Sequence, residues 1–190
     1  SNTITVREVD TAGNPSLSAT LTFELDLTAP SVDVNDIALT NDATPALTGS
    51  VNDAAAVVTV SIAGVDYTAT NNGDGSWTLV DDVVATLDQG LNTVLVVATD
   101  IAGNSASATG SVTLDSMAPS APVITLDTDS GVAGDMITKD GAFTVTPTEA
   151  GNTLEYFTNG SWTTTAPSVL EGSNTITVRE VDTAGNPSLS

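Results

Sequence analysis

The chain has 190 residues, 24 of them acidic and only three basic, which gives a formal net charge of −21. A surface this acidic makes nucleic acids and anionic membranes poor partners. The sequence contains neither cysteine nor histidine, so it excludes a disulfide framework, thiolate metal sites and a Ser-His-Asp catalytic triad.

Hydrophobic residues make up 40% of the chain but aromatic ones only 4%, so any core must be aliphatic. The dominant Thr, Val, Ala, Asp and Gly are typical of short strands joined by turns. No stretch could span a membrane and no signal peptide is present; a piece from the middle of a longer exported chain would carry neither. Nothing marks two acids as facing each other across a cleft, as glycoside hydrolysis requires, so we predict that the chain is not an enzyme.

The sequence opens on SNTITVREVDTAGNPSLS at residues 1–18, and the same letters return at 173–190. Either the chain comes from an array with a period of 172 residues, or its two ends do the same job. A looser copy, LNTVLVVATDIAGN, stands at 91–104. All copies contain a β run and the turn signature Asp-x-Ala-Gly-Asn, whose aspartates are Asp10, Asp100 and Asp182. Their spacings of 90 and 82 residues suit small β-sandwich modules.

Two short linkers divide the chain. Residues 26–30 and 115–119 both read Asp-x-x-Ala-Pro, and proline restrains its own backbone and that of the residue before it. We predict three parts: the C-terminal strands of a preceding Ig-like module (1–29), a complete Ig-like β-sandwich (30–118), and an Ig-like β-sandwich that lacks its last strand (119–190).

Apolar and β-branched runs between turn signals predict the strands. In the central module they are 31–34, 45–51, 57–62, 66–70, 77–80, 92–99 and 105–114. In the C-terminal module they are 122–127, 143–148, 154–158, 161–165 and 175–181. The strand that this module lacks has its counterpart at 19–27, after the first copy of the phrase. The expected fold class is all-β: tandem immunoglobulin-like Greek-key β-sandwich modules in an elongated array.

The acidic residues have two compatible interpretations: solubility in salty surroundings, or ligation of a divalent cation. Calcium takes about six to eight hard oxygens and tolerates irregular loops. The longest candidate loop, 127–140, has two glycines that permit tight wrapping and four aspartates: Asp127, Asp129, Asp135 and Asp140. It is not an EF-hand, because Thr138 occupies the position of the bidentate glutamate.

In an immunoglobulin-like topology the Asp-x-Ala-Gly-Asn turn lies at the end where the linker enters the module. The predicted calcium ligands at the first junction are Asp26, Thr28, Asp53, Asp100 and Asn104. Those at the second junction are Asp115, Asp182 and Asn186, and Asp10 and Asn14 are their counterparts in the first copy of the phrase. Carboxylates forced together repel each other unless a cation lies among them. The alternative is that these residues only cap turns by bonding to their own backbone.

Each module also carries a tryptophan after a Gly-Ser turn, Trp77 and Trp162. We expect both to cover one end of a core; an exposed tryptophan would instead be a platform for stacking a carbohydrate.

Together, the turn signature, the Asp-x-x-Ala-Pro linkers, the Leu-Asp-Gln-Gly-Leu-Asn-Thr run at 87–93 and the 129–140 loop resemble the bacterial Ig-like repeats of giant RTX-type surface adhesins. This family includes the extender regions of ice-binding and biofilm adhesins. The resemblance implies secreted β-sandwich extenders on the bacterial cell surface, which calcium stiffens into a rod. The rod holds a ligand-binding region away from the cell. The first loop of the central module, 35–42, is poorer in acids than the family pattern.

We therefore predict a calcium-stiffened extender for cell adhesion, whose partners are neighbouring repeats of the same chain. Nucleic acids are not expected as partners, and neither is membrane insertion. The alternatives are a carbohydrate- or ice-binding module and an accessory Ig-like domain of a secreted hydrolase. A further expectation is head-to-tail pairing, in which residues 19–27 of one molecule complete the C-terminal module of the next. Because 1–18 and 173–190 are identical, they would compete for one strand position.

Overall fold

The structure, a computed structural model, describes all residues 1–190 and consists of strands joined by turns and loops. No helix in it is long and apolar enough to cross a membrane. The residues fall into two compact units, one of 1–35, 45–85 and 93–110, the other of 36–44, 86–92 and 111–190. The central module contributes to both units, and the three-part division at 29/30 and 118/119 stays a prediction.

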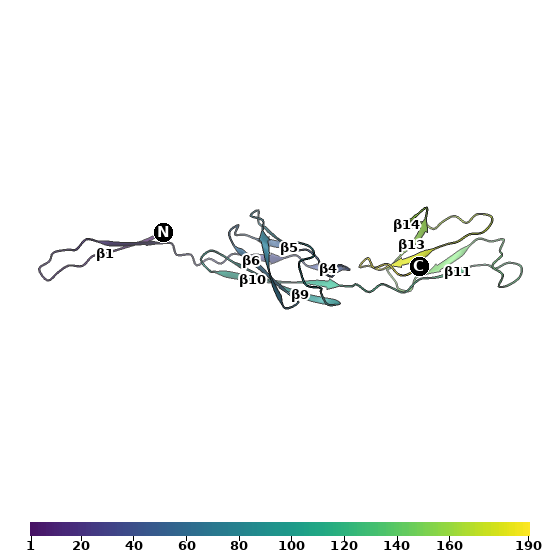
Figure 1. The fold of residues 1–190 in the computed structure, drawn as a ribbon, viewed down its shortest axis with the longest axis horizontal. Helices are drawn as coiled ribbons and strands as arrows, with labels where there is room; N and C mark the ends of the chain where they lie inside the picture. Colours follow the sequence, from purple (N-terminus) through teal and green to yellow (C-terminus); the bar gives the residue numbers. More distant parts are fainter. The chain divides into compact units, whose positions relative to one another are not determined.

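The first unit begins with an isolated hairpin. Strands β1 (Asn2–Val6) and β2 (Ala19–Phe23) pair antiparallel, from Asn2 opposite Phe23 to Val6 opposite Ala19 (Figure 1). Because side chains alternate along a strand, one face of the hairpin carries threonines and the other carries apolar residues. Every residue of both strands is exposed. The hairpin therefore has an amphipathic sheet with nothing packed on its apolar face.

The central strands are β3 (Val32–Val34), β4 (Ile37–Thr40), β5 (Leu47–Val51), β6 (Val57–Ile62), β7 (Val65–Asn71), β8 (Ser76–Leu79), β9 (Gly90–Thr99) and β10 (Ser105–Leu114). Hydrogen bonds order them β3-β5-β8-β7-β6-β9-β10-β4. Strand β7 pairs with β6 along most of its length and with β8 at its end, which divides the sheet into two halves. The all-β, immunoglobulin-like fold is confirmed. Strand β4, which pairs parallel with β10, was not predicted.

The two halves supply alternate side chains to one aliphatic core. Strand β5 buries every second residue and β6 does the same, as period-2 alternation requires. Trp77 on β8 is 0% exposed, and its indole Nε1 donates a 2.8 Å hydrogen bond to the Asp33 carbonyl oxygen. Gly49 lies opposite Trp77 on β5, where a Cβ would be only 2.6 Å from that Nε1. The core position predicted for Trp77 is confirmed.

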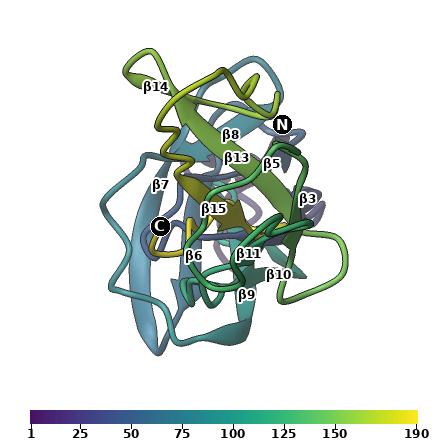
Figure 2. The same cartoon turned by 90° about the vertical axis from the view of Figure 1, so that its right-hand side faces the viewer.

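The second unit contains the C-terminal strands β11 (Val123–Leu126), β12 (Phe143–Thr146), β13 (Thr153–Thr158), β14 (Ser161–Thr163) and β15 (Val178–Val181). Strand β11 pairs with β12, and β13 lies between β14 and β15 (Figure 2). Phe143 and Tyr156 join the two sheets by an edge-on ring contact, with centroids 6.5 Å apart. The predicted strand 175–181 is too long, since only 178–181 is a strand.

Trp162 does not cover this core, so that prediction is wrong. It pairs directly with Phe157, whose neighbour Tyr156 is buried, so Trp162 lies on the opposite face of the sheet. It is only partly buried there. Its ring contacts Phe157 and lies beneath the Arg179 guanidinium, 4.3 Å from the ring centroid. A sequence cannot show which face of a three-residue strand is inward, because the alternation is too short.

Candidate functional site

The three Asp-x-Ala-Gly-Asn turns have the same hydrogen bonds. In each, aspartate Oδ1 accepts the backbone N–H groups of the alanine and the asparagine at 2.8–2.9 Å. Aspartate Oδ2 accepts the asparagine Nδ2, also at 2.8–2.9 Å. The glycine has φ of 90–97°, a region that side-chain-bearing residues rarely adopt. The aspartate, alanine, glycine and asparagine of the signature thus all take part in forming the turn.

The same bonds favour the ionised aspartates. The side-chain amide of the asparagine, with the backbone N–H groups, holds the pKa of Asp10 and Asp100 below its usual range. Burial raises the pKa of Asp182, but the bonds from Asn186 outweigh it, and the pKa is lowered. These carboxylates are therefore charged at neutral pH, and both oxygens of each already accept hydrogen bonds.

In two of the three turns the asparagine also donates a hydrogen bond to a linker carbonyl, a contact that we call the asparagine grip. The Nδ2 of Asn104 donates to the carbonyl oxygen of Asp26 at 3.2 Å, and the Nδ2 of Asn186 donates to that of Asp115 at 2.7 Å. Asn14 bonds only within its own turn. The structure thus brings together the linker and the turn that the sequence placed side by side. The asparagine side chain donates to the linker there through its Nδ2.

The other aspartates predicted as ligands at the first junction accept hydrogen bonds from nearby residues of their own turns. Asp26 Oδ1 accepts the Thr28 N–H at 2.9 Å. Asp53 Oδ1 accepts the Ala55 N–H at 2.8 Å and so caps its own turn. Its neighbour Asn52 accepts the Ser31 N–H at 2.7 Å, next to the start of β3. No hydrogen bond joins Asp53 to the linker or to the Asp100 turn.

The second linker has a further contact that sequence reasoning missed. Gln89 donates from Nε2 to Asp115 Oδ1 at 2.8 Å, and its Oε1 accepts the N–H and the Oγ of Ser116 at 3.0 and 3.1 Å. Gln89 lies within the 87–93 run that the sequence singled out only as a family feature. Its side-chain amide thus bonds to two consecutive linker residues, because it donates to one and accepts from the next. We call this contact the Gln89 bracket.

The 127–140 loop folds around Asp129. Its Oδ2 accepts the Gly134 N–H at 2.6 Å, and Thr138 Oγ1 donates to the Thr128 carbonyl at 2.6 Å. Asp135 and Asp140 each cap a turn through Oδ1, and the Asp127 N–H bonds to the Ala142 carbonyl at the neck of the loop. The Oδ1 of Asp129 is buried and has no hydrogen-bond partner. Leaving a buried polar atom unpaired is costly, so this oxygen is suited to a cation.

Nowhere do three or more acidic side chains come close enough to hold one metal ion. The acids predicted at the junctions therefore do not gather into a preformed cluster in this structure. Each linker instead has the asparagine grip, and the 127–140 loop has a single carboxylate oxygen without a hydrogen-bond partner.

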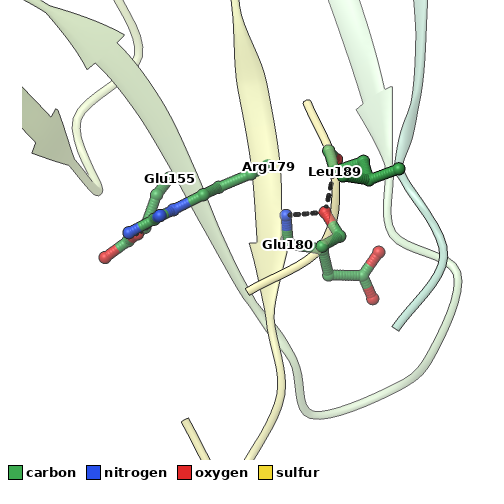
Figure 3. A network of polar contacts seen from close by, with 5 residues as sticks. Glu155, Arg179, Glu180 and Leu189 are labelled. Atoms are coloured by element: carbon green, nitrogen blue, oxygen red, sulfur yellow. Dashed lines mark hydrogen bonds and ion pairs between the residues drawn. The ribbon is translucent and has the colours of Figure 1, made fainter. Parts of the chain in front are cut away.

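Strand β15 adds a buried acid that the sequence did not single out. Arg179 and Glu180 leave β15 on opposite sides (Figure 3). Arg179 Nη2 lies 2.6 Å from Glu155 Oε2. Glu180 is 0% exposed, and its oxygens accept Thr148 N and Oγ1, Glu149 N and Asn152 Nδ2 at 2.7–3.1 Å. Burial raises the pKa of Glu180, but these bonds outweigh it and lower the pKa.

The asparagine grip gives a testable prediction. Asn186→Ala is expected to lose its linker bond and to speed amide hydrogen exchange at residues 115–117 by up to about tenfold, since one such bond contributes about 0.5–1.5 kcal/mol. Asn14→Ala is the matched control, because it loses the same turn bond but has no linker bond. Unchanged exchange at 115–117 in Asn186→Ala would mean that the grip does not restrain the linker.

Residues 31–116 match the family model of the bacterial Ig-like domain. We call this segment, which is similar to that family, the Ig-like domain. Trp77, the two-halved core and β4 all belong to this Ig-like domain. No curated protein matches the chain.

Several solved structures resemble the chain. One is the tetra-tandem repeat in the extending region of a large adhesion protein, with 22% identity over 98% of this chain and 54% of that one, at a TM-score of 0.44. A 1.5-MDa bacterial ice-binding adhesin matches at 28% identity over 60% and 42%, at 0.31. A Ca²⁺-stabilised, ice-binding adhesin of an Antarctic bacterium matches at 22% over 96% and 46%, at 0.39. The chain spans about half the length of these structures.

Proposed function

We propose that the chain is part of a calcium-stiffened extender of a bacterial cell-surface adhesin, a non-catalytic spacer outside the cell that projects a ligand-binding region. Its partners are neighbouring repeats of the same chain, and in the isolated polypeptide a second copy. The observation that carries the proposal is the linker grip, which occurs at both linkers with the same residue types (Asn104 to Asp26, Asn186 to Asp115). A spacer needs the same joint repeated, and this chain repeats it.

The grip acts on a linker that is already restrained. Pro30 and Pro119 fix their own φ and limit the residue before them. The asparagine then bonds the linker carbonyl four residues upstream of each proline. At the second linker the Gln89 bracket adds bonds to Asp115 and Ser116. Fewer free torsions at the joint mean that a pull on one module is transmitted to the next.

Calcium is proposed for two kinds of position. In the 127–140 loop the ligands would come from Asp127, Asp129, Asp135 and Asp140, with the unpaired Asp129 Oδ1 as the best prepared oxygen. At the linkers the carboxylates are Asp26, Asp53 and Asp100, then Asp115 and Asp182. When bound, the ion would supply positive charge that offsets carboxylate repulsion in a chain of net charge −21. Asn104 and Asn186 hold the linkers against the Asp100 and Asp182 turns.

Differential scanning calorimetry in calcium and in EGTA tests the proposal. Calcium that binds only the folded state should raise the melting temperature. At a free calcium concentration of 100 times its Kd, the added free energy of unfolding is about 2.7 kcal/mol. Asp129→Asn should reduce the rise in the C-terminal module. Asp74→Asn is the matched control, because the Asp74 carboxylate is already bonded to Ser76. Identical melting curves in calcium and EGTA would contradict the calcium proposal and leave the linker grip to be tested on its own.

A further inference from the structure

Two turns of the chain contain the dipeptide Asn-Gly. One is Asn72-Gly73, in the turn between β7 and β8, and the other is Asn159-Gly160, between β13 and β14. No other asparagine of the sequence precedes a glycine. Asn-Gly is the pair in which the next backbone nitrogen most easily reaches the asparagine side chain, because glycine has no side chain to hinder the approach. The chain thus holds the same reactive pair in two structural settings.

The Asn72 pair is held by hydrogen bonds on both of its reactive groups. Asn72 Nδ2 donates to Ser76 Oγ at 2.9 Å and to Thr78 Oγ1 at 3.2 Å. The Gly73 N–H donates to Asn71 Oδ1 at 3.1 Å. Bringing the Gly73 nitrogen onto the side-chain carbon of Asn72 would break these bonds, so the fold protects this pair.

The Asn159 pair has none of these restraints. Thr158 and Ser161 pair at the end of the β13–β14 ladder, so Asn159 and Gly160 form the two-residue loop of the hairpin. Their φ angles are 53° and 83°, and positive φ at both positions is typical of the type I′ turn that Asn-Gly favours. Both residues are exposed, and no hydrogen bond holds the Asn159 side-chain amide or the Gly160 N–H.

We propose that Asn159 is a site of spontaneous covalent modification, at which the Gly160 backbone nitrogen and then water convert the side-chain amide to aspartate and isoaspartate. In the first step the Gly160 nitrogen loses its proton to water and bonds to Asn159 Cγ. The Cγ–Nδ2 bond breaks, and Nδ2 takes up a proton and leaves as ammonia, which closes a succinimide ring.

Water opens this ring in the second step. Breaking the bond between Cγ and the Gly160 nitrogen gives aspartate. Breaking the bond between the backbone carbonyl carbon of Asn159 and that nitrogen gives isoaspartate, in which the main chain runs through Cγ. In sum, water is consumed and ammonia is released, so the conversion needs no enzyme and no oxidant.

Isoaspartate changes the hairpin more than aspartate does. It adds a CH₂ group to the main chain of a two-residue loop, and the length of the loop sets the register of a hairpin. The pair beyond Thr158 and Ser161 is Phe157 with Trp162, whose ring centroids lie 5.2 Å apart. The modification therefore loosens the outer face of the C-terminal module around Trp162. It involves neither calcium nor the linkers.

Peptide mapping of the full chain by mass spectrometry tests the proposal. The chain is incubated in mildly alkaline buffer, once folded and once in urea. In the folded chain, conversion of the amide to a carboxylate should be at least about tenfold faster at Asn159 than at Asn72, because the hydrogen bonds that hold Asn72 must open first. In urea these bonds are absent, so the two rates should converge.

Two variants assign the site and its products. Asn159→Gln keeps an amide but moves its carbon away from the Gly160 nitrogen, so position 159 should stay unmodified while Asn72 reacts at its former rate. Aspartate and isoaspartate peptides have the same mass but separate by chromatography. One product should coincide with the corresponding peptide of Asn159→Asp, and the other, isoaspartate, should not.

An Asn159 that stays intact in the folded chain but reacts in urea would overturn the proposal. Equal rates at Asn159 and Asn72 in the folded chain would do so too, because the hydrogen bonds would then not decide which pair reacts. Neither result bears on the calorimetric test of the extender.

Discussion

Replacing Trp77 with alanine is expected to destabilise the Ig-like domain by about 3–5 kcal/mol, the usual cost of removing a large aromatic side chain from a packed core. The indole is fully buried, and its Nε1 bond to the Asp33 carbonyl ties β8 to β3 across β5. Truncation removes both the packing over Gly49 and that bond. Urea unfolding followed by far-UV circular dichroism should show the loss in the transition of this domain.

Trp162→Ala is the matched comparison, because the chain has just these two tryptophans. Trp162 is partly exposed on an outer face, so its loss removes the Arg179 and Phe157 contacts, each of about 0.5–1.5 kcal/mol. Each variant leaves the other tryptophan as a fluorescent reporter of its own module. Equal destabilisation by the two substitutions would contradict the core position given to Trp77.

The strands were predictable where the pattern was long. Alternation in 57–62 and the run at 92–99 identified β6 and β9 because one face is buried along the whole strand. Strand β4 was missed because its four residues lie between Asn-Asp pairs and it pairs in parallel with the far end of the domain. Residues 175–177 were predicted as strand from their letters, but the strand begins only at Val178.

The candidate site was predictable to the same degree. Topology alone placed the Asp182 turn beside the Asp115 linker, and the Asn186 bond shows that they meet. The sequence could not show whether the asparagine donates or accepts in this hydrogen bond, because its side-chain amide can do either. Gln89 was missed for a related reason: its partners, Asp115 and Ser116, are 26 and 27 residues away along the chain.

Glu180→Ala is expected to destabilise the C-terminal module by about 3–5 kcal/mol. The carboxylate accepts bonds from Thr148, Glu149 and Asn152, and hydrogen bonds to a charged group contribute about 1.5–3 kcal/mol each, less than additively. Its removal leaves those donors without their acceptor and releases β15 from the 148–152 turn. Thermal unfolding followed by Trp162 fluorescence should report the loss.

The first copy of the repeated phrase provides the control, because Glu8 has the same neighbours in sequence as Glu180. Glu8→Ala substitutes the same residue in an exposed copy and should change stability by no more than about 0.5 kcal/mol. If both substitutions cost the same, the buried carboxylate is not what holds the turn to β15.

The pH dependence of Glu180 has a definite sign. Its pKa is lower in the folded module than in the unfolded chain, because its hydrogen bonds outweigh the effect of burial. The unfolded chain therefore binds the proton more readily, so this stabilisation is complete above the unfolded pKa of about 4.3 and is lost as the pH falls through the folded pKa. Glu180→Gln keeps the shape of the side chain but removes its charge. It should flatten this acid limb of the C-terminal transition, whereas Glu8→Gln should leave the limb unchanged.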